Sequence, residues 1–251
     1  MSDYIELTTD GRVTTLKINR PERKNAITQE MYADMASALS KYSEDTSIRS
    51  LIITGTGEYF TSGNDLGDFA IGEPGELPPV ARFLNALRDC PKPIIAAVNG
   101  HAIGIGLTML LHCDLVLAAR DSSFSAPFIK VGVVPEAGSS LLLPRSVGMA
   151  IANDIILTGR TLSVEEALDF GLIARILDSN IMMKKVREIA RQISQSAPDA
   201  LKRSKELIRN QNAEIKQQMV LEGQAFAAQL KSSEFTECVN AILEKRDAVF
   251  P

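Results

Sequence analysis

The sequence predicts an α/β fold followed by a layer of helices. Three short apolar runs, at residues 51–53, 94–98 and 115–119, are each bounded by turn residues, as expected for strands buried in a sheet. From about Gly148 onward the pattern favours helices instead. Strands alternating with helices, and then helices alone, are typical of an α/β core with a helical tail. We therefore expect a core at residues 1–195 and a C-terminal helical region at residues 196–251.

The first elements are predicted to be a β-hairpin and a long helix. Residues 4–7 alternate between apolar and polar, the chain turns at Asp10–Gly11, and the alternation resumes over residues 13–18. Thr28 stands at a position typical of a helix N-cap. Apolar side chains then recur at helical spacing, and we expect this helix to end near Ser43.

A stretch rich in proline and glycine, residues 72–79, can continue neither a helix nor a strand. It predicts a surface loop, followed by a helix from about Val80 to Arg88. Further along, Ser163–Glu166 is a capping box. Ser196–Asp199 starts another helix, with proline in its first turn.

Composition excludes several classes of protein. The chain has 251 residues, of which 45% are hydrophobic and 23% charged, which is enough to bury a core and argues against disorder. The net charge of -4 and the scattered lysines and arginines give no basic patch, so nucleic acid is not an expected partner. No apolar run has the length of a membrane span, and residues 1–9 lack the features of a signal peptide.

The cysteines and histidines carry no framework of disulfides or metal ligands. The cysteines are odd in number and widely spaced, which favours a reducing compartment, and we expect the cytoplasm. Neither of the two histidines has carboxylates or thiols around it at a metal-ligand spacing. His112-Cys113-Asp114 is interpreted as core and turn residues, because adjacent side chains point apart. The sequence also lacks a G-x-S-x-G elbow, a P-loop and a complete G-x-G-x-x-G motif.

Two glycine-containing turns follow predicted strands. One spans residues 60–66 and the other residues 99–106. Glycine in such turns lets backbone N–H groups approach a ligand closely, and the second turn precedes a helix. The two turns could converge on one anionic oxygen. Spacing alone supports equally the alternative that they are tight turns needed for packing.

Glu136 is the candidate catalytic acid or base. It lies among valines, a proline and an alanine, so poor solvation would raise its pKa and suit it to act as a general base at neutral pH. The alternative is that Glu136 occupies the first turn of a helix, where the helix dipole favours a carboxylate.

These segments together resemble the crotonase, or enoyl-CoA hydratase/isomerase, family over almost the whole chain. Motifs in the family's order are Arg20-Pro21 with Asn25-Ala26, Ser62-Gly63-Asn64-Asp65-Leu66, Lys92-Pro93 with Asn99-Gly100, Gly104 with Gly106, Cys113-Asp114, and Pro135-Glu136 with Gly138. The resemblance implies a spiral of ββα units, with C-terminal helices that build trimers or dimers of trimers. It also implies that each subunit binds a coenzyme A thioester.

Carried over residue by residue, the resemblance implies an oxyanion hole made by the backbone N–H groups of Asn64 and Ile105. Such donors stabilise the enolate oxygen of a thioester. The coenzyme A site would be lined by Lys24, Ala26, Ser62, Gly63, Asp65 and Leu66. Lys24 is the basic residue that we favour near phosphate, with a solvated surface lysine as the alternative.

Departures from the family's pattern indicate which reaction to expect. Hydratases of the family carry two glutamates, and the corresponding positions here hold Thr108 and Phe128. Hydration needs groups that position water and deliver a proton, whereas shifting a double bond needs one base. The Δ3,Δ2-enoyl-CoA isomerases, which act in fatty-acid β-oxidation, carry their catalytic glutamate at the position of Glu136. The motifs look most like the peroxisomal-type branch of these isomerases.

The sequence therefore predicts conversion of 3-enoyl-CoA to 2-trans-enoyl-CoA through a dienolate, without a metal or redox cofactor. One alternative is another crotonase reaction, such as hydration, ring chemistry or thioester hydrolysis, with Asp65 or Asp68 helping Glu136. Another is a non-catalytic acyl-CoA-binding protein, and a third is a nucleotide-binding regulator. The length of the acyl chain depends on how residues 72–88 pack, which the sequence does not specify.

Overall fold

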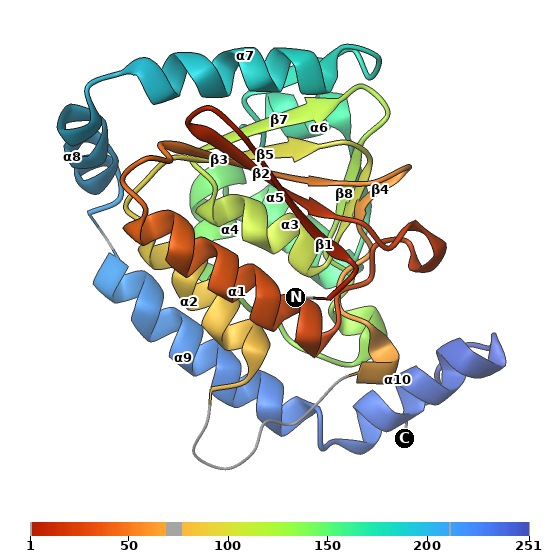
Figure 1. The fold of residues 1–251 in the computed structure, drawn as a ribbon. Coiled ribbons are helices and arrows are strands. Elements are labelled where there is room, and N and C mark those ends of the chain that lie inside the picture. Colours follow the sequence, from red (N-terminus) through yellow and green to blue (C-terminus); the bar gives the residue numbers. More distant parts are fainter. Residues whose placement is uncertain (1, 69–76, 211, 251) are drawn as a thin grey trace.

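The computed structural model describes residues 2–68, 77–210 and 212–250, and its strands form two sheets (Figure 1). The larger sheet has the order β1-β2-β3-β5-β7-β10. Its strands are β1 (Ile5–Asp10), β2 (Val13–Ile18), β3 (Ser50–Gly55), β5 (Ile94–Val98), β7 (Leu115–Ala119) and β10 (Arg175–Leu177). Strands β1 and β2 are antiparallel, and every other neighbouring pair is parallel. The predicted hairpin and the three buried strands are confirmed.

The smaller sheet has the order β4-β6-β8-β9, and the sequence analysis did not predict it. Its strands are β4 (Tyr59–Thr61), β6 (His101–Ile103), β8 (Ser123–Ser125) and β9 (Thr161–Ser163). Strands of three residues are too short to show a periodic pattern. Three times, a strand of the larger sheet is followed by a strand of the smaller sheet and then by helical structure: β3 and β4, β5 and β6, β7 and β8. This repetition is the expected spiral of ββα units.

The predicted helices are present, with the expected caps. The α-helices are α1 (Gln29–Glu44), α2 (Pro79–Asp89), α3 (Ile105–Thr108), α4 (Ser139–Val147), α5 (Met149–Thr158), α6 (Val164–Asp169), α7 (Met182–Gln195), α8 (Pro198–Ile208), α9 (Asn212–Gln229) and α10 (Ser233–Glu244). Thr28 caps α1 by accepting the N–H of Met31. Ser163 and Glu166 form the capping box of α6. Of the predicted loop at residues 72–79, residues 72–76 lie outside the described residues.

The larger sheet is covered on both faces, which explains why its central strands are continuous apolar runs. Helix α7 lies across one face (Figure 1), where Met182, Val186 and Ala190 pack on the apolar side chains of β3, β5 and β7. The opposite face belongs to the main core, which includes Met31 and Met35 of α1 and Phe83 of α2. The core therefore sits between the sheets and α1–α2, beside the site described below.

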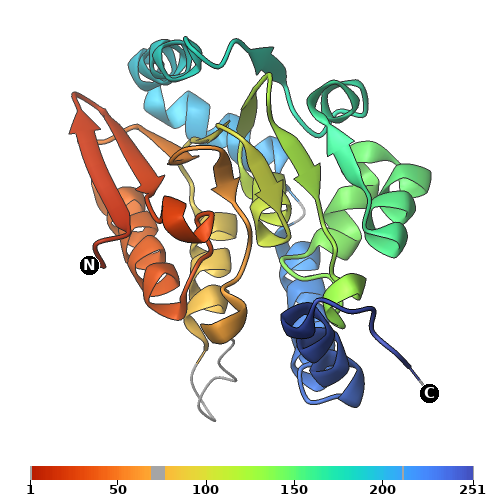
Figure 2. The ribbon, with the colours of Figure 1, turned by 90° about the vertical axis from the view of Figure 1, so that its right-hand side faces the viewer.

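The helices after α7 form the expected C-terminal helical layer. Helix α9 packs against α4, and α10 packs against the short 3-10 turn Ile129–Val131. Figure 2 shows α9 and α10 below the sheets, with the C-terminus at their side. The boundary at residue 195 stays a prediction. Within the described residues, no helix is long and apolar enough to cross a membrane.

Candidate active site

The two glycine turns lie side by side because their strands pair. Strands β4 and β6 are parallel neighbours, so the turns that follow them leave the same edge of the small sheet. A Cβ on Gly106 would lie 2.8 Å from the methyl carbon of Thr61, and one on Gly63 would lie 3.1 Å from the carbonyl oxygen of Ile103. Gly63 also has a φ of +98°, which favours glycine. Both glycines are therefore needed for the close approach of the turns, as the packing interpretation expects, and the functional interpretation stays a prediction.

Asn64 and Ile105 present backbone N–H groups at this junction. Ile27 bridges the chain on either side of Asn64, donating to Gly63 and accepting from Asp65, so the N–H of Asn64 points away from that contact. Ile105 is the first residue of α3, where an N–H has no intrahelical acceptor. Within the described part of the chain, neither N–H group donates to a protein acceptor. The structure thus brings the two predicted oxyanion-hole residues to adjoining turns.

The side chain of Asn64 is held by Tyr32, to which the sequence analysis gave no functional role. The hydroxyl of Tyr32, which is fully buried in α1, donates to Oδ1 of Asn64. Burial, and secondly the nearby charge of Glu136, raise the pKa of Tyr32 well above its usual value. Tyr32 therefore remains a hydrogen-bond donor at all ordinary pH values, and it lies near both Asn64 and Glu136.

Glu136 is bonded to the helix that carries Ile105. The hydroxyl of Thr108 donates to Oε1 of Glu136 at 2.6 Å. Thr108 is three residues after Ile105 in α3, a rise of roughly 4.5 Å along the helix. The carboxylate and the N–H of Ile105 are consequently fixed to one rigid turn of chain.

Burial gives Glu136 the properties of a base that works near neutral pH. The residue is 9% exposed. Desolvation raises its pKa to about 7, the hydrogen bond from Thr108 lowers it, and the charge of Glu222 raises it further. The alternative that Glu136 lies in the first turn of a helix is wrong, because α4 begins at Ser139.

The turn that carries Glu136 is braced by a neutral histidine. His112 is buried, which lowers its pKa to about 4, so the ring is uncharged at neutral pH. Because a carbonyl can only accept, Nε2 of His112 must be the donor in its 2.6 Å bond to the carbonyl oxygen of Ala137. The interpretation of His112 as a core residue is therefore confirmed, with a position next to the candidate base.

The residues predicted to bind coenzyme A come from two segments that run side by side. Ser62 donates its N–H to the carbonyl of Lys24 at 3.0 Å. One step along, Ile27 donates to Gly63 and accepts from Asp65, each at 2.9 Å. Segments 24–27 and 62–65 thus form a paired ledge that leads to Asn64.

Arg20 contacts both segments of this ledge. Its guanidinium donates to the carbonyl oxygen of Ala26 at 3.0 Å and forms a 2.6 Å ion pair with Asp65. Leu66 begins the 3-10 turn Leu66–Asp68 that follows. Lys24 has its Nζ 5.4 Å from the ring centroid of Tyr59, a cation–π contact.

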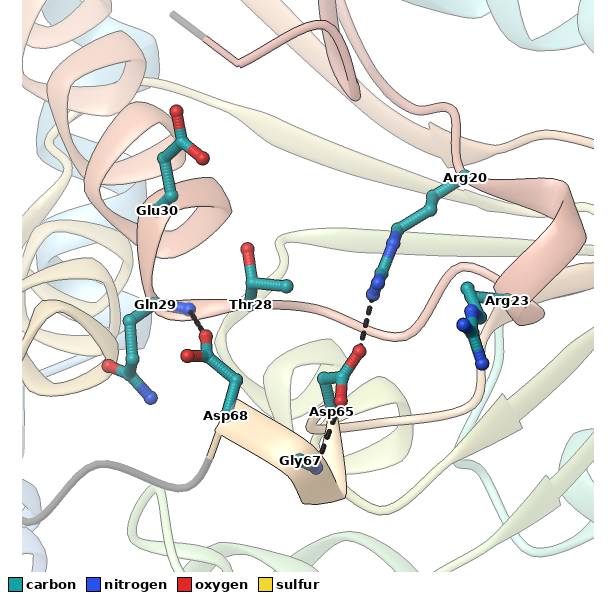
Figure 3. Close-up of a pocket in the computed structure, with 8 residues that line it drawn as sticks. All are labelled: Arg20, Arg23, Thr28, Gln29, Glu30, Asp65, Gly67 and Asp68. Atoms are coloured by element: carbon teal, nitrogen blue, oxygen red, sulfur yellow. Dashed lines mark hydrogen bonds and ion pairs between the residues drawn. The ribbon is translucent and has the colours of Figure 1, made fainter.

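A cavity of about 630 Å³ opens beside the ledge (Figure 3). Its lining residues are Arg20, Arg23, Thr28, Gln29, Glu30, Asp65, Gly67 and Asp68. In Figure 3 the carboxylate of Asp65 points to Arg20, and that of Asp68 accepts the N–H of Gln29 at 2.6 Å. The hydrogen bond from Arg20 is the main cause that lowers the pKa of Asp65. Since both carboxylates are engaged, the geometry argues against either as a second base.

Comparison with known proteins identifies the family. The model of the enoyl-CoA hydratase/isomerase family matches residues 8–251. The chain belongs to the enoyl-CoA hydratase/isomerase family. A relative named 1,2-epoxyphenylacetyl-CoA isomerase, from Escherichia coli K12, is 35% identical over 100% of this chain and 99% of its own length. A carnitinyl-CoA dehydratase from Salmonella arizonae is 36% identical and covers 98% of both chains.

Solved structures agree with this family assignment. An enoyl-CoA hydratase/isomerase from Pseudoalteromonas atlantica T6c superimposes with a TM-score of 0.96 at 48% identity, covering 99% of this chain and 100% of the other. Pseudomonas aeruginosa OdaA superimposes with a TM-score of 0.91 at 41% identity, covering 96% and 99%. The crotonase fold expected from the sequence is therefore shown.

Within this enoyl-CoA hydratase/isomerase family member, three functional candidates were missed from sequence. Thr108 was recognised only as the replacement of a hydratase acid, and Tyr32 was given no functional role. Glu222 of α9 was not considered, although its carboxylate bonds to the chain just after Glu136. No local pattern could reveal these contacts, because each joins residues at least 28 positions apart.

Proposed function

We propose that this family member is a Δ3,Δ2-enoyl-CoA isomerase with Glu136 as its single proton shuttle. The observation that carries the proposal is one buried carboxylate with a pKa of about 7, hydrogen-bonded to the same turn as the N–H of Ile105. Of the two positions where the resemblance expects hydratase acids, the first holds Thr108 and the second holds Phe128, which is buried and apolar. One base and two N–H donors are sufficient for a double-bond shift.

The proposed reaction moves one proton and one double bond. The thioester carbonyl oxygen of a 3-enoyl-CoA accepts hydrogen bonds from the N–H groups of Asn64 and Ile105, which acidifies C2. Glu136 takes a C2 proton, and the electron pair of that C–H bond enters a dienolate. Protonated Glu136 then returns the proton to C4, leaving the double bond between C2 and C3. Because nothing is oxidised or added, the reaction needs no metal or redox cofactor.

The proposal keeps the coenzyme A moiety on the paired ledge, with Lys24 near phosphate and the pantetheine arm along residues 24–27 and 62–66. It also includes a trimer or dimer of trimers and a cytoplasmic location, both as predicted from the sequence. Closeness to the peroxisomal-type branch stays a prediction.

A second candidate is isomerisation of a ring-containing coenzyme A thioester. It is favoured by the E. coli relative, named 1,2-epoxyphenylacetyl-CoA isomerase, which matches this chain over its full length. The same oxyanion hole and base would serve either substrate.

A panel of 3-enoyl-CoA, 2-enoyl-CoA and phenylacetyl-CoA-type esters would test the proposal, with products followed by ultraviolet absorbance and mass spectrometry. We expect fast interconversion of 3-enoyl and 2-enoyl esters, with deuterium entering C2 in deuterated water. Turnover of only the ring-containing esters would favour the second candidate. Binding of coenzyme A esters with no turnover and no C2 exchange would instead indicate a non-catalytic binding protein.

A further inference from the structure

Glu222 is a buried carboxylate in a mostly exposed helix. In α9, only Ile215 and Glu222 are buried, and Glu222 is 6% exposed. Burial raises its pKa, while hydrogen bonds lower it. A carboxylate is costly to bury unless its oxygens are hydrogen-bonded. What Glu222 bonds to therefore indicates why it is placed there.

Its partners are the backbone at the start of α4. The N–H of Gly138 donates to one carboxylate oxygen, and the N–H of Ser140, at 2.9 Å, and the hydroxyl of Ser140 donate to the other. Gly138 is the N-cap of α4 and has no side chain to cap the helix itself. Glu222 thus replaces a local cap from 84 residues away.

The turn held in this way is the one that carries Glu136, and it needs an external support. Ala137 and Gly138 both have left-handed backbone, with φ of +62° and +71°. For alanine this conformation is costly, so surrounding contacts must maintain it. Helix α9 also packs over the turn: a Cβ on Gly138 would lie 3.3 Å from Ile215 and 3.4 Å from Met219.

Three elements each hold a different residue of the turn. Thr108 of α3 holds the side chain of Glu136, His112 holds the carbonyl of Ala137, and Glu222 of α9 holds the N–H of Gly138. Of the residues that make these three contacts with the turn, Glu222 is the one that comes from the C-terminal helical layer. Removing it would leave two N–H groups of the turn without their acceptor.

We infer that Glu222 is a positioning residue, which sets the orientation of Glu136 through the backbone of Gly138 and Ser140. This inference rests on the proposed role of Glu136 as the base. Because proton abstraction depends on placement of the base at the sub-ångström to ångström scale, a relaxed turn lowers turnover while leaving the coenzyme A ledge intact.

The test compares Glu222→Ala, which removes every bond to the turn, with Glu222→Gln, which keeps one acceptor oxygen. Glu214→Gln is the matched control, because Glu214 lies two turns earlier in α9 and pairs with Arg145 at the surface. Turnover and KM for a 3-enoyl-CoA, C2 deuterium exchange and melting temperature are measured for each protein. We expect kcat to fall roughly 10-fold to 100-fold for Glu222→Ala and less for Glu222→Gln, with KM within about twofold of wild type. Glu214→Gln should match wild type.

A double variant shows whether Glu222 acts through Glu136. Glu136→Gln with Glu222→Ala should turn over no more slowly than Glu136→Gln alone, because the misplaced base is already absent. The inference would be overturned if the double variant showed the kcat losses of the two single variants multiplied together. It would also be overturned if folded Glu222 variants kept the wild-type kcat. If Glu222→Ala does not fold, the Glu222→Gln variant decides in the same way. Wild-type protein that neither isomerises nor exchanges C2 protons would overturn the proposed function itself, and the inference with it.

Discussion

The hydroxyl of Thr108 donates a 2.6 Å hydrogen bond to the carboxylate of Glu136, and both residues are buried. By the family resemblance, Thr108 stands where hydratases are expected to carry an acid. In this chain the position therefore supports the base instead of supplying a second one. Since Ile105 lies in the same turn of helix, this bond also fixes the distance between the proposed base and one of the proposed oxyanion-hole donors.

Thr108→Val should shift the pH dependence of turnover. The lost hydrogen bond favours the ionised form of Glu136, so its pKa should rise above the value of about 7. A bond to a charged group contributes about 1.5–3 kcal/mol, which corresponds to about one to two pH units. We expect the acid limb of the kcat profile to move up by that amount. Thr108→Ser keeps the hydroxyl and should leave the limb in place; equal profiles for valine and serine variants would contradict the assignment.

The raised pKa of Glu136 also predicts a stability cost that depends on pH. The folded value is about 7 and the reference value is 4.5, so the native state binds more protons between these values and stability falls as pH rises through this window. The penalty is absent below about pH 4.5 and complete above about pH 7, where it is on the order of 3 kcal/mol. Glu136→Gln has no such dependence.

Urea unfolding of wild type and Glu136→Gln at pH 5 and pH 8, at one protein concentration, measures this cost. The variant should gain stability relative to wild type between the two pH values. Contributions from other titrating groups, including Glu222, are present in both proteins and largely cancel. A difference between the two proteins that does not change with pH would show that Glu136 is not desolvated in the native state.

Hydratase activity should be far weaker than isomerase activity. By the family resemblance, Thr108 and Phe128 take the positions of the two hydratase acids, and the buried ring of Phe128 can neither accept nor deliver a proton. Formation of 3-hydroxyacyl-CoA from 2-enoyl-CoA, followed by mass spectrometry beside the isomerase rate, is the measurement. Comparable rates for the two reactions would contradict the single-base mechanism.

The C-terminal helices predict self-association. Leu207 and Ile208 of α8 are 76% and 82% exposed, and Leu243 of α10 is 75% exposed. Large apolar side chains that remain exposed on the C-terminal helices are typical of an interface. Light scattering at micromolar concentration should give three or six times the chain mass of 27.3 kDa. A clean monomer would remove this part of the prediction.

Much of the fold could be predicted because its signals are local. The runs that became β3, β5 and β7 are buried on both faces, so they appear in the sequence as unbroken apolar stretches. Thr28 and Ser163 cap their helices through residues three positions away, which a sequence shows directly. The small sheet escaped prediction because its three-residue strands are defined by their neighbours rather than by their own pattern.

The candidate site was only partly predictable, for the same reason. Glu136 could be singled out because its apolar neighbours in sequence are also among its neighbours in space. Its three supports could not, since the hydrogen bonds that Thr108 and His112 donate and Glu222 accepts depend on how α3, the 3-10 helix Met109–His112 and α9 pack against the turn. Asp65 and Asp68 looked equally available as bases until the structure placed them against Arg20 and the start of α1.

Glu136→Gln provides the most direct test of the mechanism. The amide keeps the size of the side chain and an oxygen that can accept from Thr108, but it lacks the basic oxygen that takes the C2 proton. Turnover should therefore fall by on the order of 100-fold to 10,000-fold, in kcat rather than KM, because the thioester is held mainly by backbone groups. Affinity for coenzyme A esters should persist, and at pH 8 the variant should be no less stable than wild type.

The paired measurement separates a base from a structural residue. Turnover on 3-enoyl-CoA is compared with melting temperature and coenzyme A affinity for the same Glu136→Gln preparation. If Glu136 served only packing, the melting temperature would drop while each folded molecule still turned over at nearly the normal rate. A variant that isomerises at near wild-type rate would refute the single-base mechanism. Asp65 and Asp68 would then be the acids to replace next, even though both are engaged by neighbouring donors.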